Sequence, residues 1–226
     1  MIAVLASRHD RAARALVDAL GRQEESRLLT ARDLSVAGWR HWVAGGPESA
    51  VIDGSPVPVD RLRAVIVRLP AVTADELPDI APADRPYVAV EMTSFLQSWL
   101  DALPCRVYNR PGGAHLCGPG WRPEQWTRCA WRLGIPAEPI VRHHRLAKDG
   151  GWVAADGPFE VVTVLGERCV GAADAQLREW ARLLAQAAGV LWLGVYFRAG
   201  RFVAADGVPD LTTEEPRAAL LESIAA

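Results

Sequence analysis

The chain has 226 residues, a formal net charge of −2 and a pI near 6.2, so no overall basic field favours nucleic acid or an anionic membrane. Half of the residues are apolar, which is enough for a core in one large or two small domains. No run approaches the roughly 20 apolar residues of a membrane span, and the first residues become charged too early for a signal peptide. We therefore expect a cytoplasmic protein that binds neither nucleic acid nor membrane.

The first half of the chain alternates strand and helix patterns. Residues 2–6 form a short apolar run, and residues 10–20 carry an apolar helical face. The loop between them lacks the glycines of a dinucleotide or Walker loop, which disfavours a Rossmann cofactor. We expect further strands at residues 28–29, 39–43, 62–69 and 106–108, a small hairpin at 51–59 and a long helix at 83–103. This order predicts an open α/β sheet, with ligands beyond the carboxyl ends of its strands.

The second half has helix signals at both ends of a hairpin-rich region. Pro123 is suited to the first position of a helix that continues to Leu133, and Glu215-Pro216 begins a final helix. Asp174 can cap a helix that Gly189 ends. The remaining patterns predict hairpins at residues 160–170 and 190–206.

The strand that ends in Asn109-Arg110-Pro111, followed by a loop, a helix and the Leu-Gly-Ile-Pro-Ala-Glu-Pro stretch at 133–139, resembles ATP-grasp ligases of the ribosomal-protein and peptide-modifying type. The helix, hairpin and terminal acid at 174–206 resemble the last part of the same family. The resemblance covers residues 1–139 and 159–226. It implies an open pre-ATP-grasp-like α/β domain at 1–111, followed by a smaller α+β remnant of the ATP-grasp C-terminal lobe at 112–226.

Residues 140–158 depart from that family. The stretch is short and broken by Gly150-Gly151, whereas the resemblance calls for a whole nucleotide-lid subdomain there. The lysines that hold phosphates would come from that subdomain, and the only lysine of the chain, Lys148, stands on a glycine-flanked turn. The chain is thus expected to be a truncated and degenerate member.

Several polar residues follow predicted strands or begin helices on the open edge of the sheet. If they converge, their arginines offer planar forks to a carboxylate or phosphate, and the acid can orient one of them. The expected ligand-binding residues are Arg68, Tyr87, Glu91, Asn109, Arg110 and Arg122.

The resemblance also implies a place for magnesium at the end of the last strand. Asp206 falls where the family has its acid, but Val208 replaces the family's Asn. One short acid is a poor magnesium site, although Asp210 lies close by in the sequence. The turn-forming residues around them suit an ordinary turn equally well.

Histidines and tryptophans leave other possibilities open. His143 and His144 are adjacent and point to opposite faces of a strand, so they do not easily share a metal. His115 and Cys117 could pair as base and nucleophile, but no third group is visible. Among nine tryptophans, Trp121, Trp126 and Trp131 cannot share one helical face, so an exposed binding or dimer surface is a further option.

These observations favour a non-catalytic ATP-grasp-like binding or accessory protein that uses no cofactor. Its arginine-lined cleft would take a peptide, a small acid or a partner enzyme. The alternative is an active ATP-dependent carboxylate-amine ligase with a reduced site, in which Asp206 and Asp210 hold Mg²⁺ and Arg110, Arg122 or Lys148 hold the phosphates of ATP. A third option is an obligate homodimer with a structural role.

Overall fold

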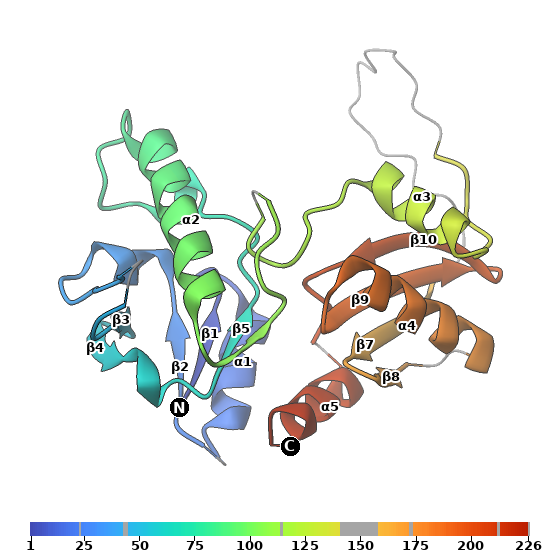
Figure 1. Cartoon of the computed structure of the whole chain (residues 1–226), viewed down its shortest axis with the longest axis horizontal. Helices are drawn as coiled ribbons and strands as arrows, with labels where there is room; N and C mark the ends of the chain where they lie inside the picture. Colours follow the sequence, from blue (N-terminus) through green and yellow to red (C-terminus); the bar gives the residue numbers. More distant parts are fainter. Residues whose placement is uncertain are drawn as a thin grey trace.

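The computed structural model describes residues 1–22, 24–42, 45–113, 115–140, 158–171, 174–211 and 213–225. Two four-stranded sheets with their helices lie side by side, and the last helix lies below the second sheet, beside the first half (Figure 1). The predicted α/β class, with an open sheet followed by a smaller α+β part, is confirmed. The two sheets fall on either side of residue 111, while the division into domains at that residue remains a prediction.

The first sheet is entirely parallel, with the strand order β2-β1-β5-β6. Its two central strands, β1 and β5, are buried along their whole length, which explains why both read as continuous apolar runs. The strands are β1 (Ile2–Leu5), β2 (Ser26–Leu29), β5 (Ala64–Val67) and β6 (Arg106–Tyr108). A separate hairpin joins β3 (Ser49–Ile52) to β4 (Ser55–Pro58).

Helices cover both faces of this sheet. The long helix α2 (Arg85–Ala102) packs Leu96 and Trp99 against one face, with Val65 and Val67 in the same cluster. On the other face lies α1 (Arg11–Leu20), whose start is capped by the Asp10 carboxylate, which accepts a hydrogen bond from the Ala13 amide at 2.9 Å. Both helices confirm the sequence expectation.

The second sheet is antiparallel, with the strand order β10-β9-β7-β8. Helix α4 begins after its predicted cap, Asp174, and ends at Gly189, whose φ of 66° suits glycine. Helices α3 and α4 share one apolar cluster with this sheet. The elements are α3 (Pro123–Arg132), β7 (Glu160–Leu165), β8 (Arg168–Val170), α4 (Ala175–Ala188), β9 (Trp192–Arg198) and β10 (Arg201–Asp206).

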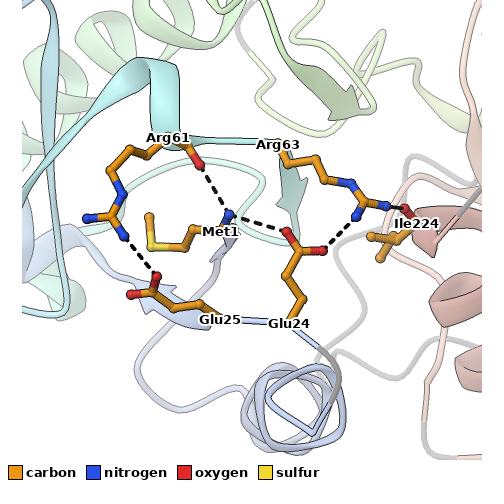
Figure 2. A network of polar contacts seen from close by, with 6 residues as sticks. All are labelled: Met1, Glu24, Glu25, Arg61, Arg63 and Ile224. Atoms are coloured by element: carbon orange, nitrogen blue, oxygen red, sulfur yellow. Dashed lines mark hydrogen bonds and ion pairs between the residues drawn. The ribbon is translucent and has the colours of Figure 1, made fainter.

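The final helix α5 (Glu214–Ala225) is bound to both halves. Its last carbonyls accept hydrogen bonds from the first sheet: Ser223 from Arg106 and from Tyr108, each at 3.1 Å, and Ile224 from Arg63. Figure 2 shows that the Arg63 guanidinium also contacts Glu24, which in turn holds the α-amino group of Met1. A cation at a helix C-terminus is stabilising, so α5 is anchored where its dipole is negative.

Helix α5 also closes a core that the two halves share. Leu220 and Ile224 belong to the same buried cluster as Ile66 of the first sheet and Trp192 of the second. We expect Leu220→Ala to lower the free energy of unfolding by about 3 kcal/mol, because the deletion leaves a cavity in this cluster. Chemical denaturation measures the change. The matched Leu191→Ala, at a side chain 37% exposed, should cost well under half as much, and equal losses would contradict this role for α5.

One predicted strand is wrong. Within the described residues 39–42 there is no strand, and the only pairing is an isolated bridge from Arg40 to Ser49. The alternation of apolar and polar residues predicted a strand paired with a neighbour, but other contacts hold this segment. The Trp39 indole donates to the Asp33 carbonyl at 2.8 Å, and its ring packs edge-on against Trp99. Short 3₁₀ turns lie at Ala31–Ser35, Val59–Arg61 and Ala74–Glu76. None of the helices in the described part of the chain has the length and apolar character needed to cross a membrane.

Candidate active site at the junction of the two sheets

Asn109 links the first sheet to the second. It follows β6 with a φ of 63°, a conformation that asparagine tolerates better than most residues, and it is 2% exposed. Its Oδ1 accepts from the amides of Leu191 (3.1 Å) and Trp192 (2.9 Å). Its Nδ2 donates to the carbonyls of Trp192 (2.5 Å) and Gly207 (3.2 Å). Asn109 therefore fixes the carboxyl end of the first sheet against β9 and the end of β10.

Arg68 supports the same junction from β5. Its Nε donates to Asp10 at 2.8 Å and its Nη1 to the Pro209 carbonyl at 3.0 Å, and its guanidinium lies 5.7 Å from the centre of the Trp192 ring. The side chain is only 7% exposed. A buried arginine paired in this way ties α1, β5 and the segment after β10 together.

The other predicted ligand-binding residues are dispersed. The Arg110 guanidinium donates to four carbonyls at the end of α2, those of Leu100, Asp101, Leu103 and Cys105. Tyr87, 70% exposed, and Glu91 lie on α2, and Arg122 stands at the start of α3. As ligand contacts all six remain a prediction, and a ligand at Arg68, Asn109 or Arg110 would have to replace bonds already made to protein atoms.

A cavity of about 260 Å³ opens beside this junction. Its polar side chains come from the loop after β6 and from the end of β10, and its walls include two indoles in edge-to-face contact, Trp121 and Trp126, with ring centres 4.8 Å apart. Its polar lining side chains are His115, Cys117 and Asp206. The sequence predicted Asp206 as a site residue, but it did not predict that His115 lines the same cavity. The run of glycines between residues 112 and 120 was the available signal, because glycine marks close backbone approach.

Two glycines allow the loop to lie against the end of β10. A Cβ on Gly207 would stand 2.3 Å from the Cys117 carbonyl oxygen, and one on Gly112 would stand 2.7 Å from Pro119 Cα. Real side chains do not fit at such distances from backbone. The cavity thus depends on glycine at both positions.

Gly207→Ala should therefore lower the free energy of unfolding by about 3 kcal/mol, since the added methyl group must push two backbone segments apart. A thermal or urea melt measures it. Gly166→Ala is the control for glycine replacement itself, because nothing lies within 4 Å of its Cβ position, although its φ of 60° adds some strain. A Gly207→Ala protein no less stable than Gly166→Ala would contradict the close approach.

His115 and Cys117 do not form a nucleophile and base. The His115 Nδ1 accepts from the Cys117 backbone amide at 3.2 Å, while the Cys117 thiol donates to the Val67 carbonyl at 3.6 Å. Burial raises the pKa of the Cys117 thiol far above its ordinary value, and Asp206 adds to the rise, so the thiolate is not available near neutral pH. The other candidates for metal or phosphate contacts, His143, His144 and Lys148, lie outside the described residues.

Asp206 and Asp210 both act on one phenol at the end of β9. Burial raises the pKa of Tyr196, and the negative charges of Asp206 and Asp210 raise it further. The Asp206 Oδ1 accepts from the Val208 amide at 2.8 Å, as in the turn expected from the sequence. Across the described residues no group of three or more His, Cys, Asp or Glu side chains could hold a metal. Mg²⁺, however, is commonly held by one or two carboxylates together with substrate phosphates, and the carboxylates of Asp206 and Asp210 are donors of that kind.

Solved structures with the same fold include a macrocyclase and ATP-grasp ligases that were solved with peptides bound. The macrocyclase MdnC of Microcystis aeruginosa MRC, bound with the precursor peptide MdnA, aligns with a TM-score of 0.71 and 8% identity over 100% of this chain and 98% of that one. The ligase PsnB, complexed with the precursor peptide PsnA2 and AMPPNP, aligns with a TM-score of 0.68 and 14% identity over 100% and 98%. A RiPP-associated ligase of Chryseobacterium gregarium, in complex with ADP and a leader and core peptide, has a TM-score of 0.69 and 7% identity over 99% and 95%. No protein-family profile and no curated protein sequence matches.

The fold is therefore that of the ATP-grasp ligases, as the sequence motifs predicted. The three solved neighbours above are a macrocyclase and two ATP-grasp ligases, each bound with a peptide. The expectation that the protein uses no cofactor is contradicted by this comparison, because ligases of the same fold hold AMPPNP, ADP, or Mg with ADP. The expected loss of the nucleotide lid concerns residues 140–158, of which 141–157 lie outside the described part of the chain.

Proposed function

We propose that this protein is an ATP- and Mg²⁺-dependent ligase that joins a carboxylate to an amine on a peptide. The observation that carries the proposal is the alignment of the whole chain with ligases complexed with precursor peptides and nucleotides. The carboxylates of Asp206, at the end of β10, and of Asp210, four residues later, support it, because they supply the donor atoms that Mg²⁺ prefers.

Each residue group has a distinct task in this proposal. Asp206 and Asp210 hold Mg²⁺, and the apolar and aromatic wall of the cavity excludes water from the reacting groups. Asn109 and Arg68 act indirectly, since they hold the end of β10 in place. When bound, ATP supplies the phosphoryl group that activates the carboxylate, and Mg²⁺ neutralises the charge that develops on the phosphates.

The first test is a thermal melt with millimolar Mg-ATP. A ligand that binds only the folded state must raise the melting temperature, by an amount that grows with concentration. Incubation with Mg-ATP and a peptide that contains both Glu and Lys side chains then tests catalysis, with loss of one water from the peptide and release of ADP as readouts. A melting temperature that Mg-ATP leaves unchanged would exclude the ligase.

A second candidate is the non-catalytic accessory protein, which binds a peptide without joining anything to it. This candidate is favoured because the polar side-chain atoms of Arg68, Asn109 and Arg110 already bind main-chain groups of the protein itself. The same experiment separates the candidates: the accessory protein binds peptide in a titration, yet neither water loss nor ADP release follows. In both candidates the expected partner is a peptide.

A further inference from the structure

The His115 ring is held in a defined orientation by its own loop. The backbone amide of Cys117 donates to Nδ1 at 3.2 Å, and the carbonyl oxygen of His115 accepts from the Gly112 amide at 3.0 Å. The absence of a side chain on Gly120 makes room for the ring, since a Cβ there would stand 2.6 Å from the His115 Cβ. The loop thus positions the imidazole as well as the cavity wall.

This hydrogen bond decides which ring nitrogen carries the proton. Because Nδ1 accepts from an amide, the neutral ring bears its hydrogen on Nε2. Burial lowers the pKa of His115, although the negative charge of Asp206 acts in the opposite direction, so the neutral ring is the main form near pH 7. His115 is therefore a hydrogen-bond donor at Nε2 and does not serve as a general base.

The surroundings of the ring indicate what it meets. Asp206 lines the same cavity, and most of the remaining wall is apolar or aromatic, including Trp121, Trp126 and Leu193. Arg68, whose positive charge acts on the cavity residue Cys117, already donates to Asp10 and to the Pro209 carbonyl. A ligand oxygen that approaches a metal on Asp206 would enter the cavity that His115 lines.

We propose that His115 donates a hydrogen bond from Nε2 to an anionic oxygen of the bound ligand, either a phosphate of the nucleotide or a carboxylate of the peptide. This inference rests on the proposed function. It adds a binding residue that neither the arginine set nor the two carboxylates include. Phosphate and carboxylate oxygens accept the same hydrogen bond, and separate titrations with Mg-ADP and N-acetyl-glutamate distinguish them.

The test uses two substitutions that separate the ring nitrogens. His115→Asn keeps an acceptor near the Nδ1 position for the Cys117 amide but removes the donor at Nε2. His115→Gln carries an amide donor close to the Nε2 position. The full-length protein and both variants are titrated calorimetrically with Mg-ADP and, separately, with N-acetyl-glutamate, and each variant is melted to verify folding.

We expect His115→Asn to bind weaker by about tenfold at an unchanged melting temperature, and His115→Gln to bind nearly as the wild type does. Weakening for Mg-ADP assigns the donor to a phosphate, and weakening for N-acetyl-glutamate assigns it to a carboxylate. Wild-type affinity of a folded His115→Asn protein for both probes would overturn the inference while leaving the proposed function intact. A wild-type protein that binds neither probe would overturn both.

Discussion

Replacing Asn109 by Ala is expected to lower the free energy of unfolding by about 5 kcal/mol. The substitution leaves the buried amide of Trp192 and the carbonyls of Trp192 and Gly207 without their partner, and each such group costs about 1 to 3 kcal/mol. A second contribution, of about 1 kcal/mol, comes from backbone strain, because alanine tolerates a φ of 63° less well than asparagine does.

Asn109→Gly separates these two contributions. Glycine adopts the left-handed conformation readily, so it removes the hydrogen bonds without adding strain. In urea denaturation, the free energy of unfolding of Asn109→Gly should be about 1 kcal/mol higher than that of Asn109→Ala and still far below that of the wild type. Two variants that unfold within about 1 kcal/mol of the wild type would show that Asn109 does not hold the two sheets together.

The second large effect concerns Asp206. Asp206→Asn should weaken Mg-ADP binding by about 100-fold, because a neutral amide oxygen is a much poorer Mg²⁺ ligand than a carboxylate. The melting temperature should stay close to that of the wild type, since Asn keeps the acceptor for the Val208 amide. Calorimetric titration with Mg-ADP measures the affinity.

Asp53→Asn provides a matched control at an exposed acid in the turn between β3 and β4. It should bind Mg-ADP as the wild type does. Chelation of Mg²⁺ by EDTA should remove the difference between Asp206→Asn and the wild type, since the carboxylate acts through the metal. An Asp206→Asn protein with wild-type affinity in the presence of Mg²⁺ would place the metal elsewhere.

Local signals in the sequence were sufficient for most of the fold. Asp174 and Gly189 mark the two ends of α4 because a cap bonds only to residues within one turn of it. The two residues of the β9–β10 turn, Ala199 and Gly200, both have positive φ, as the short corner at residues 198–201 predicted. The strand predicted at residues 39–43 is wrong because alternating apolar residues indicate only that one side is buried, whereas a strand also needs a neighbouring strand to pair with.

The candidate site was only partly predictable, for a physical reason. The sequence places Arg68 and Asn109 correctly at the ends of strands, but their partners are remote: the Asn109 amide meets Trp192, 83 residues later, and Arg68 meets Pro209, 141 residues later. A position at the end of a strand predicts that a polar side chain lies at the edge of the sheet. It does not predict whether that side chain binds a ligand or the protein backbone. The meeting of His115 with Asp206 was missed in the same way, since their cavity exists only after the loop and β10 meet.

The anchoring of α5 has a consequence for biosynthesis. One face of the first sheet, with Ile66 among its residues, is covered in part by Leu220 and Ile224, which the ribosome adds long after the strands of that sheet. Until residues 214–225 have emerged, the nascent polypeptide presents that apolar face to the solvent, although its strands are already complete. Chaperone engagement during translation should consequently persist until helix α5 docks, whatever ligand the folded protein takes.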